Sequence, residues 1–202
     1  MQSGTSAFYP ARDAEAGLRE DQRSFLESAT ISLGLPSFSY ASLRDPRVFE
    51  TVVGRSLGTC ECEKATIRGY RLGVANAEPG LPGLFPHAGS ADSEVQGIVI
   101  QGLSRFEQTM MAWYEWNEYL LCPLPLTDGR PVQAFVPDPQ AIRREYGEFD
   151  IAPWSFADWQ SRRVGRAVAE AREWMRQRPD DDALARAGCF APADIAAESI
   201  GG

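Results

Sequence analysis

The sequence predicts an α+β fold in which a small mixed or closed sheet packs against helices. Two observations lead to this prediction. Along the chain, strand and helix signals follow in the order strand, loop, helix, strands, helix, hairpin and helix, and no internal repeat is present. The length of 202 residues suits one domain of ordinary size with extensions at its ends.

The first part of the chain separates into a polar extension and the first strand and helix of the domain. Residues 1–34 are dominated by acids, arginine and serine, so we interpret them as an extension outside the core. The run 35–43, LPSFSYASL, predicts a strand that leads into a loop. Asp45 and Pro46 then combine a helix N-cap with proline at the first helical position, and Gly54 provides a C-terminal stop.

Two strands, a loop and a helix are expected in the middle of the chain. Residues 65–75 and 94–103 are β-branched and punctuated by glycine, which is typical of strands. The segment 77–93 between them is rich in glycine and proline and predicts a loop. Ser104 and Glu107 form a capping box, which predicts that a helix begins there.

A hairpin and a long helix complete the predicted domain. Residues 119–126 and 131–137 predict the hairpin strands, and prolines place the first of them at a sheet edge or bulge. Apolar residues recur at helical spacing over 155–178, so this helix is expected to pack on the sheet or on a second copy of the chain. A homodimer is therefore left open. The domain is assigned to residues 35–178, and 179–202 is expected to be a weakly ordered tail.

Charge and hydropathy restrict the expected partners and location. The formal net charge is −8 and no basic block is present, so a nucleic acid is not expected as a partner. No apolar run is long enough to span a membrane, and the first residues lack a signal-peptide pattern. The expectation is a cytoplasmic protein that acts on a small molecule and has no membrane partner.

The cysteines and the histidine offer little for metal or thiol chemistry. Cys60 and Cys62 lack the two-residue gap of a zinc knuckle, and all four cysteines are interpreted as free thiols. His87 is the only histidine of the chain, which excludes a multi-histidine metal centre, and we interpret it as a surface residue. No metal site is expected. Catalysis by Cys60 or Cys62 is disfavoured, since no histidine lies near them in sequence to generate a thiolate.

The stretch Trp113–Tyr119, WYEWNEY, carries the strongest candidate for chemistry. The sequence contains no phosphate loop, dinucleotide turn or nucleophile elbow, which leaves a carboxylate site, a thiol site or no site. Glu115 and Glu118 lie among aromatic residues here. A carboxyl walled by Trp and Tyr loses hydration, which raises its pKa toward neutrality and lets it transfer protons. The alternative is that the rings are core residues and both glutamates face solvent.

A second candidate is the segment Tyr40–Leu43 at the end of the first predicted strand. Ala41 and Ser42 are small, which leaves backbone N–H groups able to bind an anion such as a substrate carboxylate. Similar segments are common where a strand runs into a turn, so this pattern alone does not define a site.

Taken together, these segments resemble the gamma-glutamyl cyclotransferase-like superfamily, also called avirulence-induced-gene-like proteins. The resemblance is carried by Tyr40-Ala41-Ser42-Leu43, Asp45-Pro46, Gly69-Tyr70-Arg71-Leu72, Pro82 to Pro86, Val95 to Leu103, Met111 to Tyr119, Val132 to Val136 and Trp154 to Trp159. The order and spacing of these segments agree with the family over residues 36–165.

The resemblance implies a fold, a reaction and a site. The fold is a small mixed β-barrel flanked by helices. In the reaction, the α-amine of a gamma-glutamyl group attacks its own side-chain amide, giving 5-oxoproline and a free amine without a metal or organic cofactor. By the same resemblance, Glu115 is the general acid and base, and the backbone of Tyr40 to Leu43 holds the substrate's α-carboxylate. Tyr119 lines the pocket, while Glu118 faces outward or supports it from behind.

Two residues depart from the family's pattern and bear on the substrate. Ala41 replaces a glycine, and its methyl would strain a position that required a positive φ. Trp116 replaces the glycine after the acid, so it is expected to contact substrate and to reshape the pocket beside Glu115. These departures favour a specialised member that acts on a gamma-glutamyl amine or another modified amide. Two alternatives remain: an enzyme of the same scaffold that uses the glutamate for proton transfer on another small molecule, and a non-catalytic ligand-binding or interaction domain.

Overall fold

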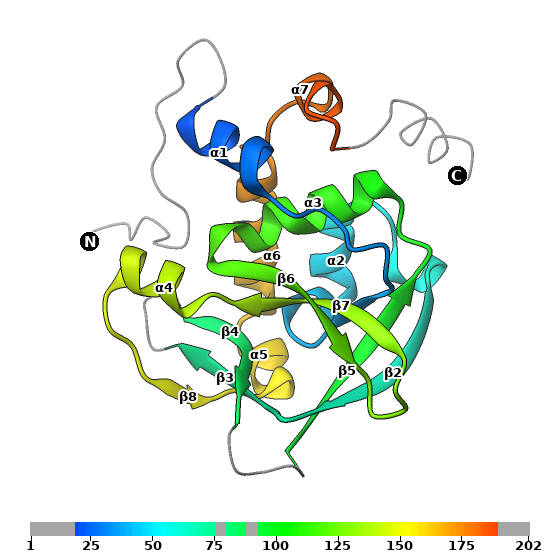
Figure 1. Ribbon diagram of the computed structural model, residues 1–202, viewed down its shortest axis with the longest axis vertical. Helices are drawn as coiled ribbons and strands as arrows, with labels where there is room; N and C mark the ends of the chain where they lie inside the picture. The colour runs from blue at the N-terminus through cyan, green and yellow to red at the C-terminus, as the bar shows by residue number, and fades with distance from the viewer. Residues whose placement is uncertain (1–18, 76–79, 88–92, 190–202) are drawn as a thin grey trace.

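Strands in two sheets, with helices around them, make up the described structure (Figure 1). The structure is a computed structural model that describes residues 19–75, 80–87 and 93–189. In these residues a five-stranded sheet has the order β2 (Glu61–Arg68), β5 (Glu94–Gln101), β1 (Ser37–Ser39), β7 (Pro131–Pro137) and β6 (Tyr119–Pro125). A three-stranded sheet of the same residues has the order β4 (Leu81–Pro86), β3 (Tyr70–Ala75) and β8 (Ile151–Pro153). The α+β class predicted from the sequence is confirmed.

The larger sheet curls toward itself without closing. Its edge strands approach at one end, where Ile67 and Leu126 form an antiparallel bridge. Next to the bridge, the N–H of Thr127 donates to the carbonyl oxygen of Thr66 at 2.9 Å. No further pairing joins β2 to β6 within the described residues, and β3, β4 and β8 form a sheet of their own. The small closed barrel implied by the resemblance is therefore not formed by this part of the chain.

The segment 65–75, predicted as one strand, is divided between the two sheets. The division falls at Gly69, where φ is 81°. On one side, β2 pairs antiparallel with β5, and on the other, β3 pairs with β4 and β8. A positive φ is costly for a residue with a Cβ, so the glycine allows the chain to leave one sheet and enter the next.

Strand β4 lies inside the predicted loop 77–93, so the loop prediction is wrong for these six residues. The strand pairs with β3 alone. Pro82 lies opposite Val74 and Pro86 opposite Tyr70, four residues apart, so both prolines point their backbone nitrogens to the same side of the strand. Because proline cannot donate, these are the positions where no N–H is needed, as an edge strand allows. Gly83 lets the strand approach β7 closely, since a Cβ there would lie 1.9 Å from Cγ of Pro137.

Local capping signals correctly predict two helices. Helix α2 (Pro46–Val53) begins after Asp45, whose carboxylate accepts a hydrogen bond from the N–H of Arg47 at 3.0 Å. It ends at Gly54, which has left-handed backbone geometry. Helix α3 (Arg105–Glu115) begins at the predicted capping box, in which the Ser104 and Glu107 side chains bond each other's backbone N–H groups. The end of α3 delivers Glu115, the central residue of the predicted site.

The predicted helix 155–178 is two helices, α5 (Phe156–Arg162) and α6 (Val164–Met175). Arg163 separates them, with φ −120° and ψ −18°. Helix α6 packs against α2 and α3, and Trp174 stacks on Trp113 of α3 with 4.9 Å between the ring centroids. The apolar stripe is thus correctly predicted as a packing face. The prediction that it packs on the sheet or on a second copy of the chain is wrong for Trp174, which packs on helix α3.

The described parts of both predicted extensions belong to the core. Helix α1 (Glu20–Ser28) buries Phe25, and helix α7 (Asp181–Arg186) buries Leu184, in one apolar cluster with the α3 and α6 side chains. The predicted boundaries at residues 34 and 179 therefore do not limit the core. One or two buried apolar residues among charged neighbours give little periodicity, which explains why the sequence does not reveal these contacts.

Short elements without a sequence prediction complete the described chain. Helix α4 (Pro139–Tyr146) begins after Asp138, and the 3-10 helices are η1 (Ser42–Arg44), η2 (Leu57–Thr59) and η3 (Trp116–Glu118). Residues 1–18 of the predicted extension and 190–202 of the predicted tail lie outside the described residues. Across the parts of the chain that are described, no helix combines the length and apolarity needed to cross a bilayer.

Candidate active site

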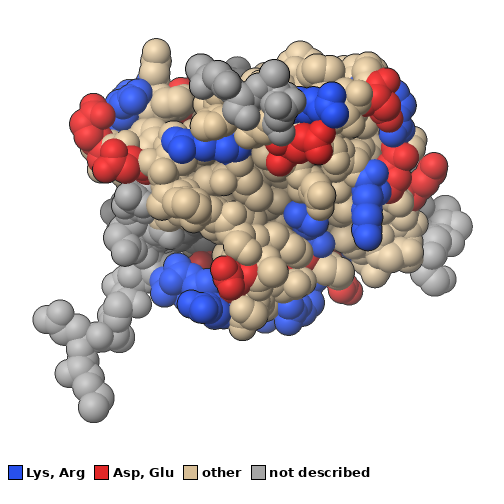
Figure 2. All heavy atoms as spheres, turned by 90° about the horizontal axis from the view of Figure 1, so that it is seen from below, with Lys and Arg blue, Asp and Glu red and all other residues tan. Residues whose placement is uncertain are grey.

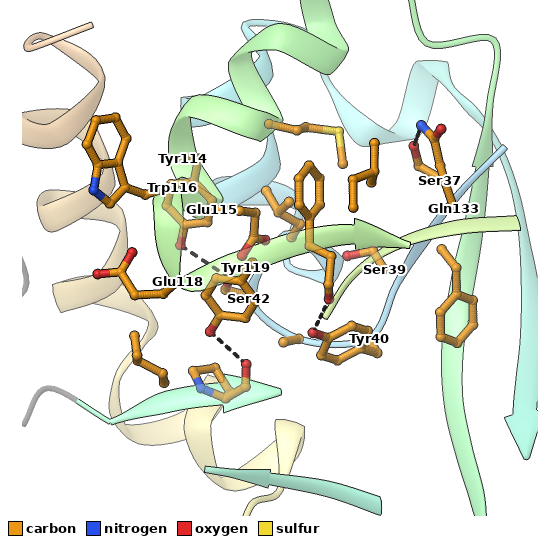
Figure 3. Close-up of a pocket in the computed structure, with 18 of the residues that line it drawn as sticks. Ser37, Ser39, Tyr40, Ser42, Tyr114, Glu115, Trp116, Glu118, Tyr119 and Gln133 are labelled. Carbon is orange, nitrogen blue, oxygen red and sulfur yellow. Dashed lines mark hydrogen bonds between the residues drawn. The ribbon is translucent and has the colours of Figure 1, made fainter. Parts of the chain in front are cut away.

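A pocket lies where the end of β1, the turn after it and the end of α3 meet strands β6 and β7 (Figure 3). Its volume, counted as the space open to the centre of a water molecule, is about 60 Å³. This is room for a few waters or one small metabolite. All seven residues that the sequence assigns to a site line this pocket: Tyr40, Ala41, Ser42, Leu43, Glu115, Trp116 and Tyr119. The two segments are joined directly, since the Tyr114 hydroxyl donates to Oγ of Ser42 at 3.2 Å.

Glu115 is the last residue of α3, and its side chain points into the pocket (Figure 3). The residue is only half-buried because it opens onto the pocket, but protein surrounds the carboxyl on its other sides. Burial raises the pKa of Glu115 to about 8, and the negative charge of Glu118 adds to the rise. At neutral pH most of the carboxyl is therefore protonated, with an ionised fraction of roughly a tenth. Such a group can both accept and donate a proton under physiological conditions.

Glu118 lines the same pocket, whereas it was expected to face outward or to support the pocket from behind. Its carboxylate accepts a hydrogen bond from the Tyr146 hydroxyl at 2.9 Å. Two carboxyl groups thus share one pocket, and the charge of Glu118 raises the pKa of Glu115. No arginine, lysine or histidine is among the described residues that line the pocket.

Trp116 has backbone geometry that is usual for glycine, with φ 55° and ψ −164°. It is the only residue other than glycine with a positive φ in the described chain. Its ring stacks on Phe25 at 6.1 Å and meets Trp174 edge-on at 5.3 Å, so it is directed away from the Glu115 carboxyl (Figure 3). Trp116 lines the pocket, as expected, but its ring joins the aromatic core instead of standing beside the Glu115 carboxyl.

The turn after β1 presents backbone donors to the pocket. Ala41 has φ −121°, so its methyl is not strained by a positive φ. Ser42 and Leu43 begin the 3-10 helix η1, and the first N–H groups of such a helix have no acceptor within it. Both residues line the pocket, so these N–H groups are available to an anionic ligand.

Three tyrosine hydroxyls in the wall are held in place as donors. Tyr40 donates to the carbonyl oxygen of Phe135, Tyr114 to Ser42, and Tyr119 to the carbonyl oxygen of Pro82 at 2.9 Å. Burial, and next to it the charge of Glu115, raises the pKa of each of these tyrosines. The phenols therefore stay neutral at the pH at which the charge of Glu115 changes.

Part of the pocket wall is polar and was not predicted from the sequence. Gln133 of β7 is 2% exposed, and its amide nitrogen donates to Oγ of Ser37 at 3.1 Å. Its amide oxygen accepts from the N–H of Leu33 at 2.8 Å. Ser39 of β1 is buried beside it and also lines the pocket. The available signal was a polar residue at an inward-facing position of the predicted strand 131–137, a position where an apolar residue is usual.

The remaining candidates for chemistry lie elsewhere. His87 is exposed and follows β4 outside the pocket. The four cysteines are free thiols, as predicted, and burial raises the pKa of Cys60 and Cys62, which disfavours thiolate formation. Among the described residues, no three His, Cys, Asp or Glu side chains are arranged to hold a metal ion.

Fold and pocket together define an α+β protein with a titratable carboxyl in a pocket lined by aromatic and polar side chains. Neither a known protein family nor a curated protein matches the sequence. The solution structure of At3g28950.1 from Arabidopsis thaliana is similar with 20% identity and a TM-score of 0.45, over 74% of this chain and 86% of that chain. The solution structure of At5g39720.1 from the same plant is similar with 22% identity and a TM-score of 0.44, over 70% and 91%. Similarity this distant says nothing about function.

Proposed function

We propose that this protein is a gamma-glutamyl cyclotransferase-like enzyme. It would act on a gamma-glutamyl amide or amine and release 5-oxoproline and a free amine. The observation that supports this best is the Glu115 carboxyl, whose pKa is raised to about 8 in a pocket that also holds the turn Tyr40–Leu43. Proton transfer between two nitrogens near neutral pH needs an acid and base of about this strength.

The reaction needs only the substrate and one proton carrier. The α-ammonium group first loses one proton to solvent, and the neutral amine nitrogen attacks the carbonyl carbon of the side-chain amide. The new C–N bond closes a five-membered lactam, and the released amine takes one proton back from solvent. Ionised Glu115 takes the proton that the attacking nitrogen loses, and then gives it to the leaving nitrogen as the original C–N bond breaks. Both nitrogens belong to one substrate, so holding them in place supplies much of the rate. No water, metal or organic cofactor enters the balance.

The charges around the pocket suit the two ends of a glutamyl group. Glu118, and Glu115 in its ionised fraction, offer negative charge to the substrate's α-ammonium group, and no cationic side chain among the described lining residues competes with it. The N–H groups of Ser42 and Leu43 would take the α-carboxylate. The neutral tyrosine hydroxyls and the Gln133 amide would complete the wall without adding charge.

The family's other features are part of the same proposal. They include a cytoplasmic location and a barrel-like curl of the larger sheet, which the bridge between Ile67 and Leu126 supports without closing the sheet. The alternative of an enzyme with a different reaction on this scaffold is kept open by Trp116 and Ala41, which replace glycines of the family pattern. The non-catalytic alternative loses its main argument, because Glu115 lies in the pocket rather than facing solvent.

The direct test is 5-oxoproline release by the purified protein. Gamma-glutamyl amines and dipeptides would be supplied, and 5-oxoproline measured by mass spectrometry. Glu115→Gln keeps the shape of the side chain but cannot carry a proton, so we expect a loss of about 10²- to 10⁴-fold in rate. Glu118→Gln is the matched control three residues away in the same pocket, and it should cost much less.

Three outcomes separate the alternatives. Loss of 5-oxoproline release in Glu115→Gln alone supports the cyclotransferase. If Glu118→Gln is instead the inactive variant, the acid and base has been assigned to the wrong carboxyl. If the wild-type protein releases no 5-oxoproline from any gamma-glutamyl compound, the proposed reaction is wrong.

A further inference from the structure

A larger hollow adjoins the candidate active site on the side of α5 and α6. By the same measure its volume is about 500 Å³, compared with about 60 Å³ for the pocket around Glu115. Ser42, Pro82 and Tyr114 line both spaces, so the two share one wall. Figure 2 looks onto this side of the molecule, where basic side chains gather beside a hollowed part of the surface. We refer to this space as the α5–α6 groove.

Arginines give the α5–α6 groove a positive side. Arg162, Arg163 and Arg166 line it at the junction of the two helices, and Asp158 and Glu170 line it as well. Arg166 pairs with Glu170 at 2.6 Å. Arg162 and Arg163 are exposed, and neither forms an ion pair with a described residue. In a chain with a formal net charge of −8, two guanidinium groups without acidic partners beside a groove are available to an anionic ligand.

Aromatic rings form a second side of the groove. Trp154 and Trp159 both line it and are half-buried, with 6.1 Å between their ring centroids. Phe156 packs on Trp159 at 5.8 Å and fixes it from behind, while the Arg44 guanidinium covers Phe156 at 4.5 Å. Half-buried indoles held by neighbours present a flat apolar surface on which a planar group can stack.

We propose that the α5–α6 groove binds the amine part of the substrate, and that this part carries an aromatic ring and one carboxylate. The inference rests on the proposed function, because it assigns the small pocket to the glutamyl group and the shared wall to the amide between them. The arginines would bind the carboxylate and the tryptophans the ring. Three arginines against Asp158 and Glu170 leave one excess positive charge, which suits a carboxylate better than a phosphate with its charge near −2.

Four substrates form a matched test of both recognition elements. Gamma-glutamyl-tryptophan has ring and carboxylate, gamma-glutamyl-tryptamine the ring alone, gamma-glutamyl-alanine the carboxylate alone, and gamma-glutamyl-ethylamine neither. We expect kcat/KM for the first to exceed that for each of the others by at least about 5-fold. Equal rates for the tryptophan and tryptamine compounds, or for the tryptophan and alanine compounds, would overturn the proposal.

Substitution of the arginines locates the effect in the groove. Exchanging Arg162 and Arg163 together for glutamine should lower the preference for gamma-glutamyl-tryptophan over gamma-glutamyl-tryptamine to below about 2-fold. Arg172→Gln is the control, since Arg172 is exposed on the same helix α6 and does not line the groove. A preference that survives the double exchange, or that Arg172→Gln removes equally, contradicts the assignment.

A binding measurement separates failure of the groove from failure of the reaction. N-acetyltryptophan and N-acetyltryptamine differ in the carboxylate alone, and neither needs turnover. Calorimetry on the wild-type protein should show tighter binding of N-acetyltryptophan, and the double arginine variant should bind the two alike. If no 5-oxoproline is formed from any compound but this difference is seen, the groove assignment stands and the reaction is wrong. If the two probes bind equally, the groove assignment is wrong whatever the reaction.

Discussion

At the scale of single residues, the position of Glu115 explains its unusual acidity. The residue ends α3, so the partial negative charge at the C-terminal end of the helix opposes ionisation of the carboxyl. Burial and the charge of Glu118 act in the same direction. A carboxyl kept protonated at this place has a cost, because at pH values between the unfolded and folded pKa only the unfolded chain gains free energy from ionising it.

This cost predicts a pH-dependent gain in stability for Glu115→Gln. The pKa of Glu115 is about 8 in the folded protein, against 4.5 for a free glutamate, so between these values the folded state holds more protons than the unfolded state. Stability of the wild type therefore falls as pH rises through this window, and the glutamine variant escapes that fall. Relative to wild type, the variant should gain on the order of a few kcal/mol between pH 5 and pH 8. Urea denaturation at both values measures it, and an equal difference at the two pH values would contradict the raised pKa.

Trp116 gives a second prediction at the residue scale, based on its φ of 55°. A residue with a Cβ is strained there, whereas glycine is not. Trp116→Ala and Trp116→Gly both lose the ring contacts with Phe25 and Trp174, but only the glycine also relieves the strain. We expect the alanine variant to be less stable than the glycine variant by about 1 kcal/mol. Thermal denaturation of the pair decides it, and a more stable alanine variant would show that the backbone does not hold this conformation.

At the scale of elements, predictability follows from where the determining contacts lie. Asp45 with Pro46, and Ser104 with Glu107, start helices through contacts within a few residues, so the sequence is sufficient. Asp138 with Pro139 starts α4 by the same signal, so this helix is also predictable from the sequence. The break between α5 and α6 falls at Arg163, which is neither glycine nor proline, and we attribute it to the packing of α6 on α2 and α3.

Strand β4 shows the opposite case, where a tertiary contact overrides local composition. Gly83 lies against Pro137, and a Cβ would meet the proline ring at 1.9 Å. Gly83→Ala should therefore destabilise the protein by about 1–3 kcal/mol. Gly165→Ala is the matched control, because the space around that glycine in α6 is open and alanine favours a helix. Gly165→Ala should stabilise the protein by up to about 1 kcal/mol. If both variants shift the denaturation midpoint in the same direction, the packing of β4 on β7 is contradicted.

At the scale of the whole molecule, the site depends on a long-range meeting that no local pattern specifies. Tyr40–Leu43 and Glu115 could be predicted as site residues because two weakly specific motifs occur in a fixed order along the sequence. The buried amide of Gln133 and the inward position of Glu118 depend on how β7 and the end of α3 face the same space. The α5–α6 groove likewise requires the turn at Arg163, which brings Arg162 and Arg166 to one side.

The core also depends on segments that the sequence places outside the domain. Phe25 and Ile31 come from the predicted N-terminal extension, and Leu184 and Cys189 from the predicted tail, yet all four are buried in the main apolar cluster. Burial of each large apolar side chain contributes about 1.5–3 kcal/mol, while the whole stability of a domain is about 5–15 kcal/mol. A chain limited to residues 35–178 should therefore lose most of its stability. Circular dichroism during heating would measure this loss.

Point variants in the full chain show whether these contacts are the cause. Phe25→Ala and Leu184→Ala should each cost about 2–5 kcal/mol, because each leaves a cavity against α3 or its neighbours. Arg23→Ala is the control. It changes an exposed residue of α1, the helix of Phe25, and should change the free energy of unfolding by less than about 0.5 kcal/mol. If the truncated chain unfolds at the same temperature as the full chain, α1 and α7 are not part of the cooperative core. If only the truncation is destabilising and both alanine variants are neutral, contacts other than these two side chains hold the termini in place.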